Sequence, residues 1–131
     1  MADSVAYLSQ AWLDLQRDLV GALPERPGAT ATVQHVVSGA PDGEIRWTEQ
    51  IVDGRLTAAT LGDDPDAEVT LTQTYADAVE IARGELDANA AFMQGRVKVV
   101  GDMGAVMALM PLTDSDEYRA ALAELARQTT Y

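Results

Sequence analysis

The sequence predicts an α+β fold, because stretches with helical spacing of apolar residues stand on both sides of a region in which apolar residues alternate. Apolar residues between Tyr7 and Leu19 recur at the three- and four-residue intervals of a helix face. From residue 32 to residue 73 the period changes to two, and glycine-containing turns separate the runs. Beyond residue 74, polar capping residues introduce further helical segments. We therefore expect five strands and about five helices in a chain whose 131 residues are most simply one domain, 1–131.

The first helix is predicted to begin after Ser4, whose hydroxyl can cap the helix N-terminus. The apolar residues of its buried face are Tyr7, Leu8, Ala11, Trp12, Leu15 and Leu19. We expect this helix to end near Gly21, because Pro24 and Pro27 make the next segment a loop.

The alternating region predicts four strands, three of which form an antiparallel meander. Ala-Pro-Asp-Gly at 40–43 is typical of a turn, and Asp-Gly at 53–54 is typical of a tight hairpin. A fourth strand follows at 67–73, after the loop Gly-Asp-Asp-Pro-Asp.

Glu49 is the one polar interruption on the strand face formed by Ile45, Trp47 and Ile51. One interpretation is an edge position or a strand bulge, where a carboxylate reaches water. The other is a polar anchor for the headgroup of a ligand, and the sequence leaves both open for Glu49. For His35, on the preceding strand, a structural or surface role is the better interpretation than catalysis, and contact with a ligand headgroup stays open.

Two helical segments and a fifth strand are predicted next. Thr74 begins a helix, with Asp77 in the capping-box position, and Gly84 ends it. Asp87 caps a short turn through Phe92 and Met93, Gly95 stops it, and residues 96–100 form the strand.

Two more helices complete the expected order. Asp102 caps a helix that runs to Pro111, and Thr113 with Asp116 opens the last one. The last helix carries Tyr118 and Leu122 among its apolar positions.

The charge of the chain limits its partners. The net charge is −12 and the pI is about 4.2, so the surface repels nucleic-acid phosphates and anionic lipid headgroups. We expect no nucleic-acid binding and no stable membrane insertion, because the longest apolar run, 103–112, is about half the roughly 20 residues of a spanning helix. No basic segment precedes an apolar run at the N-terminus, so we expect a cytoplasmic protein.

No motif for catalysis, metal binding or cofactor binding is present. The chain lacks cysteine, GxGxxG, a P-loop and a GxSxG elbow, and His35 is its single histidine. Asp63, Asp64, Asp66 and Glu68 do not have EF-hand spacing, so a solvated acidic loop is the better interpretation. We therefore predict no catalytic residue, no metal and no cofactor, although spacing alone does not exclude a carboxylate acid–base pair.

A concentration of soft apolar side chains is the most distinctive feature. Met103, Met107 and Met110 fall at i, i+4 and i+7, one stripe of a helix, and Phe92 and Met93 lie just upstream. Methionine is flexible and polarizable, which suits apolar ligands of different shapes. We expect this stretch to belong to the core, either simply packed or as the wall of a pocket.

Residues 68–112 resemble the C-terminal half of the sterol carrier protein 2 family of non-specific lipid-transfer domains. The segment Gly-Glu-Leu-Asp-Ala-Asn-Ala-Ala-Phe-Met-Gln-Gly (84–95) is similar to one family motif. Arg-Val-Lys-Val-Val-Gly-Asp (96–102) is similar to the next. Order and spacing agree over about a third of the chain, as in freestanding bacterial members.

The resemblance implies a five-stranded, mainly antiparallel twisted sheet with helices over one face, enclosing an apolar tunnel. It implies non-catalytic binding of fatty acyl chains, acyl-CoA, sterols or similar molecules. The lining it implies is Trp47, Ile51, Phe92, Met93, Val97, Val99, Met103, Met107, Met110, Tyr118 and Leu122, with the last two in a helix that serves as a lid.

Two alternatives stay open beside the lipid carrier. One is an interaction or regulatory module with a filled interior and an exposed apolar patch, working as a homodimer or with a lipid-metabolising enzyme. The other is a small enzyme for an apolar substrate, which requires a buried titratable residue such as His35, Glu49 or Asp102 facing a cavity.

Overall fold

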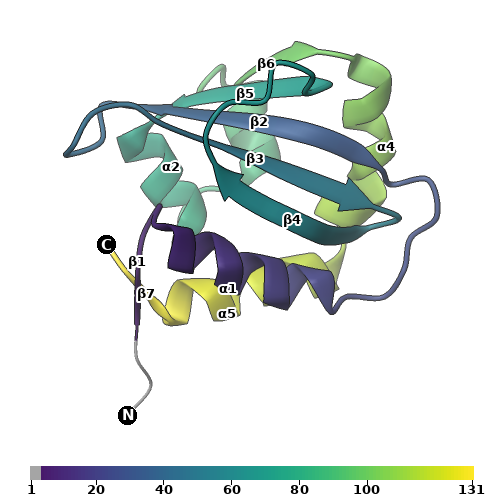
Figure 1. Cartoon of the computed structure of the whole chain (residues 1–131), viewed down its shortest axis with the longest axis horizontal. Coiled ribbons are helices and arrows are strands. Elements are labelled where there is room, and N and C mark those ends of the chain that lie inside the picture. The colour runs from purple at the N-terminus through teal and green to yellow at the C-terminus, as the bar shows by residue number, and fades with distance from the viewer. Residues whose placement is uncertain (1–3) are drawn as a thin grey trace.

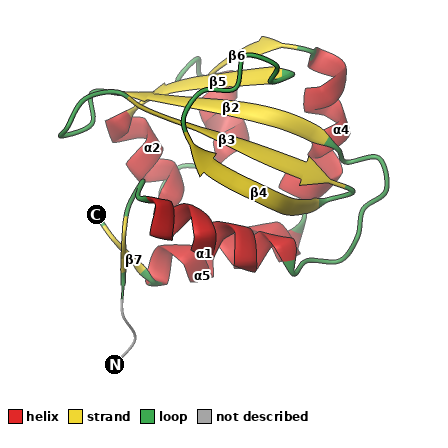
Figure 2. Ribbon diagram, viewed as in Figure 1, coloured by secondary structure: helices red, strands yellow, loops and turns green. Residues whose placement is uncertain are grey.

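The computed structural model describes residues 4–131, which form five helices and seven strands (Figures 1 and 2). The strands are β1 (Val5–Ala6), β2 (Ala31–Ser38), β3 (Ile45–Val52), β4 (Arg55–Leu61), β5 (Val69–Thr74), β6 (Lys98–Gly101) and β7 (Thr129–Thr130). The helices are α1 (Gln10–Gly21), α2 (Tyr75–Ala82), α3 (Ala88–Met93), α4 (Met103–Thr113) and α5 (Asp116–Arg127). The expected α+β class is confirmed.

The main sheet has five strands in the order β4-β3-β2-β5-β6. Neighbouring strands are antiparallel except β2 and β5, which run parallel. The predicted meander is β2-β3-β4, and the chain then crosses to the far side of β2 before it enters β5. A five-stranded, mainly antiparallel sheet is therefore confirmed, with β2 and β3 in its interior.

The helices lie on one side of the sheet, where they cover its apolar face (Figure 1). Helix α1 packs against β4 and beside α5, and α4 packs over β2 and β5. The opposite face of β3 carries exposed Arg46, Gln50 and Val52. The space between the two layers holds the core, whose most buried side chains are Leu13, Val20, Val37, Val69 and Leu112.

The predicted start of the first helix is wrong, because the residues after Ser4 form a strand. Val5 and Ala6 pair with β7 in a short parallel ladder. Leu8 then takes a positive φ of 65°, which turns the chain, and Ser9 caps α1 through the amide of Trp12. The end of the helix at Gly21 is confirmed.

The predicted caps of α2, α3 and α4 are confirmed at Thr74, Asp87 and Asp102. Asp77 is not engaged as a capping-box partner, since its carboxylate accepts hydrogen bonds from Arg96 at 2.9 and 2.6 Å. This ion pair joins α2 to the segment before β6.

The boundary between the last two helices lies further along the chain than predicted. Helix α4 continues through Pro111 to Thr113, so the proline that was expected to end the helix lies inside its last turn. Ser115, not Thr113, caps α5, and its hydroxyl accepts from the amide of Tyr118.

The prediction that the methionine stripe belongs to the core is wrong. Met103, Met107 and Met110 are 50%, 71% and 39% exposed, and Met93 is 84% exposed. A neighbouring stripe of α4, made of Ala105, Leu109 and Leu112, faces the sheet instead. Because α4 is apolar on all sides, helical spacing alone did not distinguish its buried face.

Replacement of Gly101 by alanine is expected to destabilise the fold more than replacement of Gly84. Both glycines have positive φ, 126° and 78°. A Cβ at Gly101 would lie 2.3 Å from the carbonyl oxygen of Glu68, whereas a Cβ at Gly84 would meet nothing within 4 Å. We expect Gly84→Ala to cost about 1 kcal/mol from backbone strain and Gly101→Ala clearly more. Urea unfolding of both variants measures this difference, and equal losses would contradict the close approach of β6 to Glu68.

Candidate functional site

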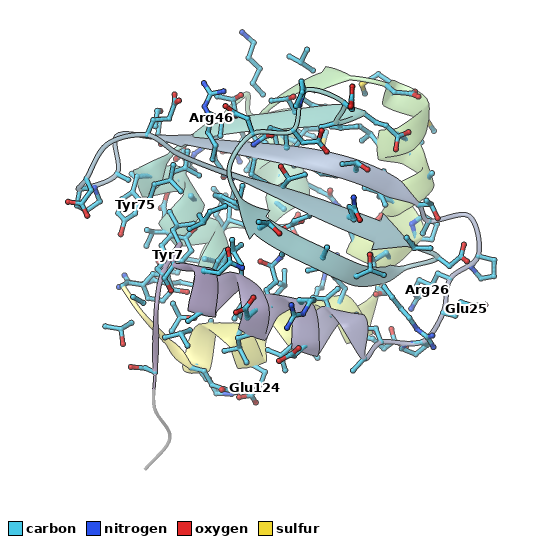
Figure 3. The ribbon with its side chains drawn as sticks, in the orientation of Figure 1. Tyr7, Glu25, Arg26, Arg46, Tyr75 and Glu124 are labelled. Carbon is cyan, nitrogen blue, oxygen red and sulfur yellow. The ribbon has the colours of Figure 1, made fainter. Side chains whose placement is uncertain are left out.

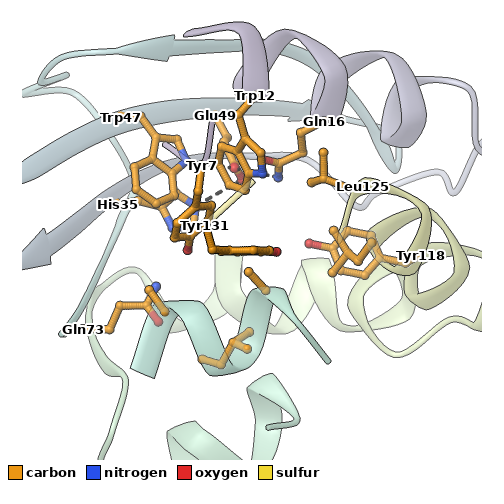
Figure 4. Close-up of a pocket in the computed structure, with 14 residues that line it drawn as sticks. Tyr7, Trp12, Gln16, His35, Trp47, Glu49, Gln73, Tyr118, Leu125 and Tyr131 are labelled. Atoms are coloured by element: carbon orange, nitrogen blue, oxygen red, sulfur yellow. Dashed lines mark hydrogen bonds and ion pairs between the residues drawn. The ribbon is translucent and has the colours of Figure 1, made fainter. Parts of the chain in front are cut away.

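A cavity of about 120 Å³ lies between the sheet and helices α1, α2 and α5 (Figure 4). One side of its wall comes from the sheet and α1, the other from α2, α5 and the two chain ends. The lining residues are Tyr7, Trp12, Gln16, His35, Trp47, Glu49, Gln73, Ala78, Ile81, Ala82, Tyr118, Leu122, Leu125 and Tyr131.

The register of β2 and β3 places the polar residues of the wall together. His35 lies opposite Trp47, and Val33 lies opposite Glu49. Alternation on each strand therefore turns His35, Trp47 and Glu49 toward the same face. The rings of His35 and Trp47 stack with centroids 4.6 Å apart and planes within 4° of parallel.

Glu49 is 6% exposed, and all of its partners come from the cavity wall. Its Oε2 accepts hydrogen bonds from Gln16 Nε2 at 2.9 Å and Trp47 Nε1 at 3.1 Å. Its Oε1 lies 3.1 Å from His35 Nε2, the distance of an ion pair. The expectation of an edge position is wrong for Glu49, since β3 is an interior strand; a register shift in the β3–β4 pairing begins only after Gln50.

The surroundings keep Glu49 ionised. Burial raises the pKa of this carboxyl, but the interaction with His35 and the hydrogen bonds from Trp47 and Gln16 outweigh burial, so the pKa lies below the usual value for glutamate. A carboxylate with a lowered pKa is a weak proton acceptor, which makes it poorly suited to general-base catalysis.

Aromatic side chains close the end of the cavity that lies near the chain ends. The ring centroid of Tyr7 lies 5.0 Å from that of Trp12 and 5.0 Å from that of Tyr131, all three labelled in Figure 4. It lies 6.0 Å from the ring centroid of Tyr75, which Figure 3 labels with Tyr7. The guanidinium of Arg83 covers the Tyr131 ring at 4.7 Å.

The tyrosines in the wall stay protonated. Burial, followed by the charge of Glu49, raises the pKa of Tyr118 above its ordinary value. Burial also raises the pKa of Tyr7 and of Tyr131. The lining residues contain no serine, threonine or cysteine, so the wall offers neutral phenols rather than an activated nucleophile.

The structure places three of the predicted lining residues at this cavity, namely Trp47, Tyr118 and Leu122. Ile51 and Val97 are buried away from it, Val99 is half-buried, and Phe92, Met93, Met103, Met107 and Met110 are exposed. Of the titratable candidates, His35 and Glu49 line the cavity, while Asp102 is exposed at the start of α4.

Sequence reasoning missed the contribution of α1 to the site. Trp12 and Gln16 are four residues apart, so both face the cavity from one side of the helix. A glutamine that interrupts the apolar face of α1 was the available signal, because its partner Glu49 likewise interrupts an apolar face.

Within residues 4–131, no cluster of three or more histidine and acidic side chains could hold a metal ion. None of the helices described is both long enough and apolar enough to cross a bilayer.

Replacement of Glu49 by glutamine is expected to lower the free energy of unfolding by about 1–3 kcal/mol near neutral pH, since it removes the charge that His35, Trp47 and Gln16 satisfy. A carboxyl with a lowered pKa stabilises the fold above the pKa of the unfolded chain, about 4.3, and this stabilisation is lost as pH falls through the folded pKa. The difference between wild type and Glu49→Gln should therefore shrink below about pH 4.3. Chemical unfolding across pH tests this, with Glu44→Gln as an exposed control; a difference that grows on acidification would contradict it.

Comparisons with known proteins agree with this fold. Residues 15–114 match the profile of the SCP-2 sterol transfer family. The chain is 30% identical over 89 residues to non-specific lipid-transfer protein-like 1 of Caenorhabditis elegans, a match covering 66% of this chain and 72% of that one. It is 30% identical over 77 residues to sterol carrier protein 2 of Gallus gallus, covering 58% of this chain but only 14% of the longer chicken protein.

The solution structure of a conserved protein from Thermus thermophilus superimposes with a TM-score of 0.73 over 96% of both chains, at 16% identity. This similarity supports the fold alone. Because the family profile covers most of the chain, from within α1 to the end of α4, the protein belongs to the SCP-2 sterol transfer family.

Proposed function

We propose that this protein binds apolar small molecules without covalent chemistry and carries them between sites. The observation that carries the proposal is the cavity between the sheet and helices α1, α2 and α5. Family membership and the names of the matched relatives, which describe sterol and lipid transfer, support the same conclusion. Fatty acyl chains, acyl-CoA and sterol-like molecules are the ligand classes that we consider.

Ligand entry requires the cavity to widen. Its volume of about 120 Å³ is below the roughly 300 Å³ at which pockets for small organic molecules begin. Helices α2 and α5 face each other across the cavity with Ala78, Ala82, Leu122 and Leu125. If the two helices separate around an apolar chain, these side chains stay out of water, so little free energy of apolar burial is lost. We propose that α5 serves as the lid, with Tyr118 and Leu122 on its inner face.

The free energy for this opening comes from apolar burial. Each buried methylene contributes about 0.8 kcal/mol, so ten contribute about 8 kcal/mol before ordering costs. Micromolar affinity corresponds to a net gain of about 8 kcal/mol, so a ligand must bury more than about ten methylenes to reach it without a strong polar contact.

The other predicted contacts remain part of the proposal at the edge of the helix layer. Phe92, Met93 and the methionines of α4 are exposed, so they are available to an apolar molecule that approaches from solvent, and methionine side chains adapt to ligands of different shapes. Ile51, Val97 and Val99 would be reached only if the interior opens further.

Replacement of Ala82 by phenylalanine is expected to weaken the binding of a fluorescent long-chain lipid at least about tenfold, because the ring would occupy the cavity. Ala76→Phe is the matched control, since Ala76 lies on the same helix but is exposed and outside the lining. Titration followed through the emission of Trp12 and Trp47 measures the effect. Equal affinity of the two variants would place the ligand elsewhere, and no saturable uptake by wild type would overturn the carrier function.

The exposed apolar patch supports a second candidate function, an interaction module. Phe92, Met93, Val100, Met103, Met107 and Met110 are large apolar side chains that are all more than a third exposed, and they come from neighbouring segments of the chain. Such a patch is typical of a protein contact, and a small cavity is compatible with a non-binding interior.

The interaction module predicts self-association that depends on this patch. Sedimentation velocity of wild type, Met107→Gln and Val52→Gln distinguishes the cases, because Val52 is exposed on the outer face of β3, away from α4. A dimer that only Met107→Gln dissociates would favour a homodimeric module. A monomer in all three samples would remove the support for a homodimer.

A further inference from the structure

The carboxylate of Glu49 lines the cavity, and one of its oxygens receives no hydrogen bond from the described residues. Gln16 Nε2 and Trp47 Nε1 both donate to the other oxygen, Oε2. Oε1 has the ring of His35 beside it, and neither nitrogen of that ring makes a hydrogen bond of good geometry. Because each carboxylate oxygen can accept two hydrogen bonds, Oε1 is an unfilled acceptor in the cavity wall.

The neighbouring side chain of Gln16 adds a second unfilled acceptor. Its Nε2 donates to Glu49, and an ionised carboxylate accepts but does not donate, so the amide can be placed only one way round. The atom of this 6% exposed side chain that is buried without a partner is therefore its oxygen. Since Gln16 is bonded directly to Glu49, the two acceptors belong to the same part of the wall.

This part of the wall also carries a negative charge that folding has already removed from water. Although burial raises the pKa of Glu49, the interaction with His35 and the hydrogen bonds keep that pKa below its usual value. Within residues 4–131 the one ion-pair neighbour of Glu49 is His35, which is charged only when protonated. The chain as a whole has a net charge of −12 and so attracts cations. A cationic ligand therefore meets a carboxylate that needs no further desolvation.

A primary ammonium group has the properties that these atoms require. It carries a positive charge and three N–H donors, which suit Glu49 Oε1 and Gln16 Oε1, and aromatic ring faces attract its charge. A ligand carboxylate has no donor and would place a second anion beside Glu49. The guanidinium of Arg83 lies over the Tyr131 ring, but Arg83 is exposed, so water screens its repulsion of a cation.

The rest of the wall indicates the body of the ligand. Both tryptophans and three of the four tyrosines of the chain line the cavity. Flat rings pack well against such side chains. The cavity volume of about 120 Å³ is close to the roughly 150 Å³ of a protein cavity that holds one benzene molecule. A ligand with a single ring therefore needs far less widening of the cavity than a long acyl chain.

We propose that the cavity binds primary-amine cations with a compact aromatic body, such as arylmethylamines, and prefers them to the corresponding alcohols and acids. This inference rests on the proposed function, because it uses the same cavity, and it names a ligand class for that cavity. The ammonium group would lie at Glu49 and Gln16, and the ring would pack against Trp12, Tyr7 and Tyr118 (Figure 4).

The test compares one-ring ligands that differ in the head group: benzylamine, benzyl alcohol, benzoate and toluene. Affinities at neutral pH come from calorimetry and from the emission of Trp12 and Trp47. We expect benzylamine to bind at least about tenfold tighter than the other three, because hydrogen bonds between charged groups are about twice as strong as neutral ones. Glu49→Gln should abolish this preference. Glu44→Gln makes the same charge change at an exposed position and should preserve it.

A second pair of variants covers a loss of folding in Glu49→Gln, which circular dichroism detects. Ala82→Phe then takes its place, because the added ring would occupy the cavity, and Ala76→Phe is its exposed control on the same helix. Benzylamine should bind to Ala76→Phe and not to Ala82→Phe. Equal binding to both would place the amine outside the cavity and overturn the inference.

The outcomes separate this inference from the proposed function. If benzyl alcohol, benzoate or toluene binds as tightly as benzylamine, the preference for amines is wrong and the unfilled acceptors serve only ordered water. An equal loss in Glu49→Gln and Glu44→Gln would assign the preference to net charge and would also overturn it. A parallel titration uses the fluorescent long-chain lipid. Lipid uptake without benzylamine binding overturns the amine site and leaves the carrier function, whereas benzylamine binding without lipid uptake does the reverse.

Discussion

The buried carboxylate of Glu49 is the constraint around which the interior is arranged. An ionised group at an interior strand position is tolerated only when donors surround it. Gln16 supplies one donor from α1, Trp47 supplies one from the same strand, and His35 of β2 places its Nε2 3.1 Å from the second carboxylate oxygen. Satisfying one charge therefore fixes the helix against the sheet and sets the rotamers of three neighbouring side chains.

The same arrangement creates the polar side of the cavity. Gln16 donates a hydrogen bond from its amide nitrogen to Glu49, and its amide oxygen is left without a partner in the cavity wall. His35 Nε2 lies 3.1 Å from Glu49 Oε1, and neither ring nitrogen makes a hydrogen bond of good geometry within the described residues. The site is polar next to the sheet and α1 and apolar between α2 and α5, and this division would orient an amphiphile with its head toward the sheet.

Much of the fold could be predicted from the sequence, because alternation marks the strands and capping side chains mark the starts of α2, α3 and α4. The errors arose where the conformation of a segment depends on a partner far away in the sequence. Val5 and Ala6 form a strand only because β7 lies beside them. The site was harder to predict. Glu49 was visible in the sequence as a polar residue on an apolar strand face. Its role as a buried carboxylate, however, depends on β3 being an interior strand and on α1 turning Gln16 toward it. The methionines stood out as well, yet their helix is apolar on every side, and the small Ala105 lets a different stripe approach the sheet.

The cavity and the exposed methionines differ in how they could recognise a ligand, and their separation suggests how transfer would proceed. The exposed apolar surface of α3 and α4 carries no polar group that could orient a ligand, so any contact there would be non-specific. The cavity has polar atoms that could orient a head but is too small for a long tail. A carrier with this division would collect apolar molecules without selection at its surface. It would select among them only when α2 and α5 separate, because the cavity of about 120 Å³ is too small for a long tail until that step.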